Sequence, residues 1–358
     1  MPEQPPQVPS PPSARPTSQS PPSRGTTGRR PASGKLPPVV LARDLTPAAT
    51  QAAVRAGTLE RIRTGAYRRP THVSVPASTS AATPPALSAA TAAVPAAAAR
   101  ELALARIAAV DRQLRTAFWF SHESAALVWG CAVWKPPTRT HLIQTFRAHQ
   151  QGDPLTTRHF LPLTPADRTR WRGVPVTTLD RTVVDCLTRL PPLDALVIAD
   201  SALRLGVDPG VIADRLGTMA GHRGIAGARV VLDHADARAE SPWETFVRYV
   251  LVSHGLPRPD LQIPVHTRLG WFWADLGWPE WKLLIEFDGF VKYSGNDPAR
   301  TVYEEKRRQD AIEEEGLSVL RVTAADLRRP ATFLDRVCRR LPEHVVAHRT
   351  PVRAFSTW

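Results

Sequence analysis

Residues 271–289 read WFWADLGWPEWKLLIEFDG, and this stretch decides the fold that we expect. Its first half predicts a strand that ends at Asp275, and the turn at 278–280 then returns the chain antiparallel. Its second half predicts a buried strand that carries Glu286 and Asp288. Because residues i and i+2 of a strand point to one face, these two acids share one side of the sheet.

Acidic side chains on an otherwise apolar strand need a compensating partner. A buried carboxylate is costly unless it is ion-paired or metal-bound. Mg²⁺ takes one or two protein carboxylates, keeps several waters and bridges to substrate phosphate. Asp275 and Glu286 lie on neighbouring predicted strands, so the sequence predicts a site for Mg²⁺, or for Mn²⁺, between them.

The flanking segments extend this pattern into an α/β sandwich over residues 240–343. Ser241 starts an apolar helix, ETFVRYVLVSHG, which ends at Gly255, and LQIPVHT then predicts a strand. After the two strands above come a charged helix, VYEEKRRQDAIEEEG, and SVLRVTAADL, a strand with a helix start. The predicted order is helix, strand, strand, strand, helix, strand, helix. Glu244 follows Ser241 by three residues, the spacing of a capping box.

The runs D-x-G-W-P-E, E-F-D-G, E-K-R-R-Q-D-A and G-L-S-V-L-R-V-T-A-A-D-L resemble the restriction-endonuclease-like domain related to very-short-patch-repair nucleases. The resemblance spans about residues 240–340 and implies the PD-(D/E)xK nuclease fold. It implies that Asp275 is the acid of the motif's first strand and Glu286 the metal-binding residue of the second. It also implies that Asp288 matches the family's D-G step and that Glu244 completes the site.

Two departures from the family pattern concern the catalytic base. The general pattern has Lys two residues after the Glu, where Asp288 stands here, and the short-patch-repair enzymes have a His near Lys292 and Tyr293. Lys292 is the first candidate to replace the base, by orienting a water or neutralising a phosphate. Lys306 and Arg308 on the next predicted helix are the others. If none reaches the site, the domain binds metal or DNA without cutting.

Several of these residues also have structural explanations. Asp288 before a glycine is typical of a turn. Asp310 and Glu313–Glu315 are typical of a solvated helix face with partners four residues away. The tryptophans of this region are either core and rim residues or a base-stacking platform; they are Trp271, Trp273, Trp278 and Trp281.

Residues 39–70 predict a small basic unit. Thr46 and Pro47 are typical of the start of a helix that ends at Gly57, and a strand, a turn at Gly65 and a second strand follow. Helices before a basic hairpin indicate a winged helix, whose arginines contact DNA phosphates. The alternative is a solvated helical hairpin with ordinary surface arginines. The candidate DNA-binding residues are Arg55, Arg61, Arg63, Arg68 and Arg69.

Residues 98–239 predict a mixed α/β scaffold. Ser124 beside His122 lacks the G-x-S-x-G elbow of hydrolases, and the histidines show no metal-ligand spacing. The hydrophobic pattern indicates strands around 141–146 and 174–177 and helices at ARELALARIAAVDRQL, HESAALVWG, LDRTVVDCL, LDALVIADSAL, DPGVIADRL and GARVVLDHA.

Three further segments stand out within about residues 39–235, which the insertion at 71–97 interrupts: LTPAATQAAVRAGTLERIRTGAYRR, SHESAALVWG and GVPVTTLDRTVVDCL. They resemble the AbiEi antitoxin family of bacterial type IV toxin–antitoxin systems. The resemblance implies an N-terminal winged helix and a transcriptional regulator. It also makes a toxin or another protein a candidate partner of the middle domain.

Composition completes the description of this chain of 358 residues, whose formal net charge is +13. The excess of Lys and Arg lies before residue 240 and favours a polyanionic partner such as DNA. Residues 1–38 predict a disordered basic Pro-rich arm, 71–97 a low-complexity linker and 344–358 a tail. Three widely spaced Cys make no disulfide framework, and no apolar run suits a signal peptide or membrane span, so we expect a cytoplasmic protein.

The expected fold is an α/β multidomain chain with an N-terminal winged helix, a mixed α/β middle domain and a C-terminal PD-(D/E)xK nuclease-like sandwich. Three functions stay open. The first is a metal-dependent DNA endonuclease that the winged helix targets to DNA. The second is a DNA-binding regulator whose nuclease-like domain is non-catalytic. The third is an antitoxin that binds its partner through residues 98–239.

Overall fold

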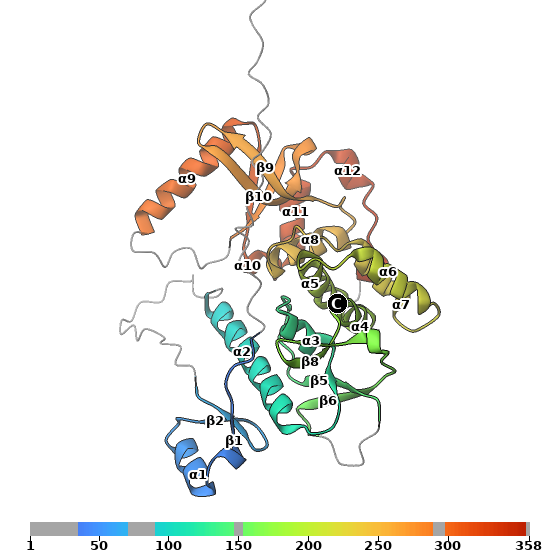
Figure 1. Cartoon of the computed structure of the whole chain (residues 1–358). Coiled ribbons are helices and arrows are strands. Elements are labelled where there is room, and N and C mark those ends of the chain that lie inside the picture. Colours follow the sequence, from blue (N-terminus) through green and yellow to red (C-terminus); the bar gives the residue numbers. More distant parts are fainter. Residues whose placement is uncertain (1–34, 71–89, 147–152, 289–297, 356–358) are drawn as a thin grey trace, which may run out of the picture.

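The computed structural model describes residues 35–70, 90–146, 153–288 and 298–355 (Figure 1). Most of the expected basic arm and of the 71–97 linker therefore lies outside the described residues. The same holds for Lys292, the first candidate for the replacement base.

The N-terminal unit is a three-stranded sheet with one helix of nine residues. Thr46 caps the helix by accepting a hydrogen bond from the backbone of Ala49, and Pro47 is its first residue. Gly57 and Gly65 both have φ of 68°, the left-handed conformation that the helix end and the hairpin turn require. The predicted helix and hairpin are confirmed. The strand order is β1-β3-β2, and the elements are β1 (Val40–Leu41), α1 (Pro47–Arg55), β2 (Glu60–Arg63) and β3 (Ala66–Arg68).

The helix α2 (Ala90–Gln113) corrects the expected extent of the linker. Its first residues, 90–97, were expected to belong to the low-complexity linker, but they are helical. The segment is rich in Ala, which has the highest helix propensity, and this outweighs Pro95 near the helix start. Buried residues of α2 pack against both the N-terminal sheet and the middle sheet, so α2 connects the two cores.

The middle region is a five-stranded sheet, in the order β6-β5-β4-β8-β7, with helices packed beside it. The predicted strands at 141–146 and 174–177 and the predicted helices are confirmed. The strands β4, β6 and β7 were not predicted, because they are short or carry few apolar residues. The elements are β4 (Trp119–Phe120), α3 (His122–Trp129), β5 (Thr140–Gln144), β6 (Thr156–Phe160), β7 (Arg168–Trp171), β8 (Val174–Thr177), α4 (Leu179–Arg189), α5 (Pro192–Arg204), α6 (Pro209–Thr218) and α7 (Ile225–Asp233).

The C-terminal region has the element order that the sequence predicts. Its sheet order is β12-β11-β10-β9, with β11 and β12 parallel and the other neighbours antiparallel. The elements are α8 (Pro242–Ser253), β9 (Asp260–Thr267), β10 (Gly270–Trp278), β11 (Leu283–Phe287), α9 (Pro298–Glu314), β12 (Ser318–Val322), α10 (Ala324–Leu327), α11 (Pro330–Cys338) and α12 (Glu343–Ala347).

Two details of the deciding stretch differ from expectation. Asp275 does not end its strand, because β10 continues to Trp278 and the chain turns in a short 3-10 helix before Lys282. Asp288 lies just beyond β11, although its N–H still donates to Val322 at 2.9 Å. We expected Glu286 and Asp288 on the same strand. Glu286 lies in β11, whereas Asp288 follows it.

The two helices α8 and α9 pack on opposite faces of this sheet (Figure 1). Ile285 belongs to the large core that also contains α8, whereas its neighbour Leu284 packs with Ile312 of α9. Strand alternation then places Glu286 on the α9 face. The apolar side chains of KLLIEF thus pack against α8 on one face of the sheet and against α9 on the other.

Residues 344–355 are packed rather than a free tail. Phe355 is fully buried, and its carbonyl accepts a hydrogen bond from the Tyr249 hydroxyl of α8 at 2.8 Å. The left-handed Gly255 lies so close to Thr350 that an added Cβ would come within 2.5 Å of its nitrogen. The expected tail is therefore a last layer of the C-terminal core.

All three cysteines are free thiols. Among the described helices, none combines the length and the apolar character that crossing a membrane needs.

Candidate functional site

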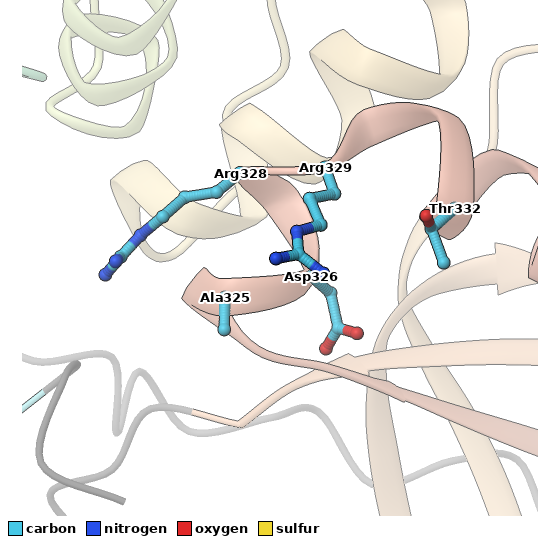
Figure 2. A pocket seen from close by; sticks show the side chains of 5 residues that line it. All are labelled: Ala325, Asp326, Arg328, Arg329 and Thr332. Atoms are coloured by element: carbon cyan, nitrogen blue, oxygen red, sulfur yellow. The ribbon is translucent and has the colours of Figure 1, made fainter. Parts of the chain in front are cut away.

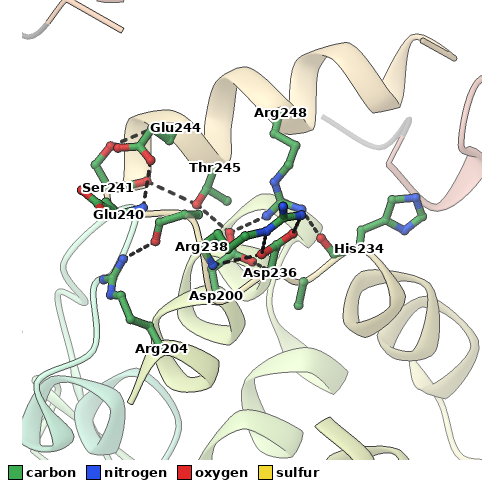
Figure 3. A network of polar contacts seen from close by, with 12 residues as sticks. Asp200, Arg204, His234, Asp236, Arg238, Glu240, Ser241, Glu244, Thr245 and Arg248 are labelled. Atoms are coloured by element: carbon green, nitrogen blue, oxygen red, sulfur yellow. Dashed lines mark hydrogen bonds and ion pairs between the residues drawn. The ribbon is translucent and has the colours of Figure 1, made fainter. Parts of the chain in front are cut away.

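The carboxylate of Glu244 is positioned by the start of α8. Ser241 caps the helix by accepting a hydrogen bond from the Glu244 N–H at 3.2 Å (Figure 3). The Glu244 carboxylate accepts from the Glu240 N–H at 2.8 Å and from the side-chain amide of Gln262 at 3.1 Å. The capping role is thus confirmed for Ser241, while the carboxylate reaches the residue before the cap. Gln262 was not predicted as a site residue.

A buried ion pair fixes the next turn of the same helix. Arg248 of α8 and Asp200 of α5 lie 2.5 Å apart and are 1% and 3% exposed (Figure 3). Asp200 also accepts hydrogen bonds from the Thr245 hydroxyl at 2.7 Å and from the Asp236 N–H at 2.8 Å. Burial still raises the pKa of Asp200, against the lowering effect of Arg248. This network anchors α8 to the middle region and so holds Glu244 in place.

Asp275 lies where the strands β10 and β11 separate. The paired residues of this ladder end at Leu276 and Ile285, and Asp275 is the next residue of β10. Its carboxylate accepts a hydrogen bond from the Phe287 N–H at 2.8 Å. At this position a side-chain oxygen is thus the acceptor, in place of the backbone carbonyl of a regular ladder. On the other side, the opposed residue Gln262 has φ of 54°, which marks an irregularity in β9.

Glu244 and Asp275 form an electrostatically coupled pair of carboxyl groups. The pKa of Glu244 is raised to about 7, first by burial and second by the charge of Asp275. The hydrogen bonds from Glu240 and Ser241 act in the opposite direction. Two such carboxyls can share a proton near neutral pH, or they can hold a divalent cation.

Glu286 has a different partner from the one expected. Its carboxylate accepts from Arg308 of α9 at 2.5 Å, and its side chain is 12% exposed. Arg308 also contacts Glu305 at 3.2 Å, and Arg321 contacts the same Glu305 at 2.6 Å. Of the cations proposed to replace the missing lysine, Arg308 therefore reaches the candidate site, whereas Lys306 is exposed.

The structure thus divides the predicted site in two. Asp275 is coupled to Glu244, and Glu286 is paired with Arg308 on the face that α9 covers. Within the described residues these three carboxylates do not converge as a ligand group. The one group of three metal-ligating side chains found there is His122, His141 and His159, whose ligating atoms lie within 4.8 Å of one another. The sequence spacing of the histidines gives no metal-ligand pattern, and they meet only because strand pairing and a helix start bring together residues that are distant in sequence.

The five predicted DNA-binding arginines fall into two groups. Arg63 pairs with Asp153 at 2.7 Å and Arg68 with Glu60 at 2.8 Å, so these two hold the hairpin in place. The side chain of Arg61 lies along its own hairpin turn, 3.5 Å from the Thr64 hydroxyl. The exposed members of the set are Arg55, Arg61 and Arg69.

A hollow lies beyond the end of β12, where α10 and α11 follow the strand. Its volume is about 430 Å³, and the exposed Arg328 and Arg329 extend from the turn between α10 and α11 at its edge (Figure 2). Because Glu286 pairs with Arg321 in the parallel ladder, this hollow and the carboxylates lie at the same end of the sheet. The remaining lining residues are Ala325, Asp326 and Thr332.

Comparison with known proteins gives relatives without an assigned activity. No protein-family model matches the chain. It is 34% identical over 163 residues to the uncharacterized proteins Rv2248 and MT2308, from two strains of Mycobacterium tuberculosis. The alignment covers 45% of this chain and spans 59% of the length of those relatives. Among solved structures, the RV2827C protein from Mycobacterium tuberculosis is similar over 55% of this chain and 72% of its own, at 18% identity and a TM-score of 0.31.

Proposed function

We propose that this chain is a metal-dependent DNA endonuclease with a PD-(D/E)xK nuclease-like domain at its C-terminal end. The observation that carries the proposal is the buried Glu244, whose pKa is raised to about 7 beside Asp275 at the point where two strands separate. Two carboxylates side by side repel each other and do not stabilise the fold. A divalent cation bound between them removes this repulsion. The observed element order, which is the one expected for the nuclease fold, supports the same proposal.

The donor set fits a hard divalent cation. Asp275 and Glu244 would hold Mg²⁺ or Mn²⁺, and Gln262 orients Glu244 through its amide. When bound, the ion polarises the scissile phosphate and lowers the pKa of an attacking water. Glu244 acts here as a ligand of the cation and not as the proton acceptor, because a bound cation lowers the pKa of a coordinating carboxyl. Arg308 is suited to neutralise a phosphate oxygen, and Glu286, which pairs with Arg308, would have to be released before it could join the cation.

Two sets of exposed arginines support DNA as the substrate. Arg55, Arg61 and Arg69 lie on the N-terminal unit, and Arg328 and Arg329 line the hollow at the same end of the sheet as the carboxylates. Exposed guanidinium groups are the usual contacts to phosphate oxygens. In the proposed complex, the N-terminal unit acts as a winged helix that supplies general affinity, and the hollow receives the backbone of the strand to be cut.

Plasmid nicking by the full-length protein tests the proposal. Supercoiled DNA is incubated with protein in Mg²⁺, Mn²⁺ or EDTA, beside an Asp275→Ala/Glu286→Ala variant. The matched control is Asp310→Ala, which removes an exposed carboxylate from α9. We expect metal-dependent nicking that the double variant loses and the control retains. Absence of nicking by the wild type in both metals, with DNA still bound, overturns the proposal.

A second function is favoured by the ion pair between Arg308 and Glu286. In a nuclease whose carboxylate is permanently neutralised, the domain recognises DNA without cutting it, as in a transcriptional regulator. This reading predicts a mobility shift that is the same for wild type and for Asp275→Ala/Glu286→Ala, and no nicking by either. The antitoxin alternative, with a protein partner on the middle region, predicts little DNA affinity near physiological salt.

A further inference from the structure

Three histidines from separate elements of the middle region meet in one cluster. His122 is the first residue of α3, while His141 and His159 lie on the paired parallel strands β5 and β6. His141 Nδ1 and His159 Nε2 lie 3.0 Å apart, and the rings of His122 and His159 stack at 4.1 Å between centroids. The cluster lies outside the acidic site and has no part in the proposed cleavage.

His122 contains the observation that points to a ligand. Its side chain is 2% exposed, its Nδ1 is 2.9 Å from the Ser121 hydroxyl, and its Nε2 is buried without any hydrogen-bond partner. The backbone of His122 is also in the left-handed region, with φ of 50°, which is uncommon outside glycine. A buried imidazole nitrogen without a partner is costly unless something else satisfies it.

From these contacts we propose that His122, His141 and His159 bind one Zn²⁺ ion, or a similar transition metal that prefers imidazole. Nitrogens that share a tetrahedral zinc at about 2.05 Å lie roughly 3.4 Å apart. The ligating atoms here lie within 4.8 Å of one another, so small ring rotations suffice. The hydrogen now shared between His141 and His159 moves to the outer nitrogen of its ring, so both rings bind as neutral imidazoles.

One nearby carboxylate, Glu123, favours the double positive charge of Zn²⁺, and two nearby arginines, Arg181 and Arg189, oppose it. The buried carboxylate oxygen Oε2 of Glu123 has no hydrogen-bond partner, and its charge acts on His141. The nearby Arg181 is already paired with Asp185 at 2.9 Å.

The ligand count makes this an open site. Within the described residues no fourth His, Cys, Asp or Glu joins the group. Closed structural zinc sites have four protein ligands, whereas three histidines leave one position for water or a small anion.

Zinc titration of the full-length protein tests this proposal. The protein is stripped with EDTA, dialysed, and titrated with Zn²⁺ against a chromophoric chelator, with Co²⁺ as a second, visibly absorbing probe. We expect one ion per chain. The single variants His141→Ala and His159→Ala should each weaken binding by more than about 100-fold, beyond the range typical for loss of an outer partner.

Two controls distinguish this site from surface binding and from the acidic site. His222→Ala removes an exposed histidine elsewhere, and Asp275→Ala alters the proposed Mg²⁺ site; both should bind Zn²⁺ like the wild type. Because His122 is buried, His122→Gln is used with circular dichroism to confirm folding. Failure of the folded wild type to bind one Zn²⁺, or an equal loss in His222→Ala, overturns the proposal, and neither result depends on DNA cleavage.

Discussion

Two buried carboxylates contact the same helix, α8, in opposite electrostatic settings. Asp200 meets the guanidinium of Arg248 and two further hydrogen-bond donors, so its charge is compensated. Glu244 belongs to α8, one turn before Arg248. It lies beside a second acid, Asp275, and its pKa is raised to about 7. The first arrangement serves stability, because every charge has a partner. In the second arrangement the two acids repel each other unless a cation or a proton is bound. This is why we propose that the functional site includes Glu244 and Asp275.

The largest expected effect concerns the compensated pair. Asp200→Ala leaves the guanidinium of Arg248, which is 1% exposed, buried without its carboxylate. We expect the free energy of unfolding to fall by about 3–5 kcal/mol, the usual result of breaking a buried pair. Urea denaturation measures it. The control Asp214→Ala, an exposed acid on α6, should change stability by less than about 0.5 kcal/mol. An equally small effect of Asp200→Ala would remove the contrast between the two carboxylates.

The second effect is a pH dependence of stability that arises from Glu244. Its folded pKa, about 7, is above the unfolded value of about 4.3, so the folded state binds the proton more tightly. Its stabilising contribution is present below pH 4.3 and is lost as pH rises through 7. In wild type, the free energy of unfolding should fall over this pH range by on the order of 1–3 kcal/mol because of Glu244, and Glu244→Gln should remove this fall. Denaturation midpoints in EDTA from pH 4.5 to 8 compare the variant with wild type, and parallel curves would contradict the assignment.

A third effect follows if Mg²⁺ satisfies the uncompensated pair. At pH 8 in wild type, Mg²⁺ at about ten times its Kd should raise stability by about 1.4 kcal/mol through binding alone. Asp275→Ala should lose this gain, whereas Asp200→Asn, if folded, should keep it. Thermal unfolding with Mg²⁺ or EDTA provides the measurement. A shift that survives Asp275→Ala would place the ion elsewhere.

The smallest effect on stability concerns the arginines of the N-terminal unit, which also divide into paired and exposed side chains. Arg63 and Arg68 have acidic partners, while Arg61 and Arg69 are exposed. Arg61→Ala with Arg69→Ala should leave stability within about 0.5 kcal/mol and reduce the salt slope of DNA binding by about 1.8. Arg63→Ala should lower stability and leave the slope unchanged. Mobility shifts at several salt concentrations decide, and the reverse pattern would exclude the exposed pair as phosphate contacts.

What the sequence predicts well is what nearby residues determine. The α8 cap at Ser241, the hairpin with its turn at Gly65, and the order of elements from α8 to β12 follow from local spacing and turn chemistry. The acidic residues were found for the same reason, since an acid in an apolar strand is conspicuous in sequence. The extents of β10 and α2 were misjudged at their boundaries, where propensity changes gradually.

What the sequence did not predict depends on tertiary pairing. The histidine cluster joins a helix start to two parallel strands, and β6 carries little apolar signal of its own. Gln262 became a partner of Glu244 only because β9 is irregular opposite Asp275. The pairing of Glu286 with Arg308 required knowledge of which sheet face α9 covers. No spacing rule in the sequence encodes these choices.

The burial of Phe355 has a consequence for how the chain is made in the cell. The core around Tyr249 and Gly255 stays open until residue 355 has been synthesised and has left the ribosome. The N-terminal sheet, by contrast, has a separate core with α2 and can fold while translation continues. A nascent chain that has not yet reached residue 355 therefore lacks part of the core that supports α8 and its Glu244.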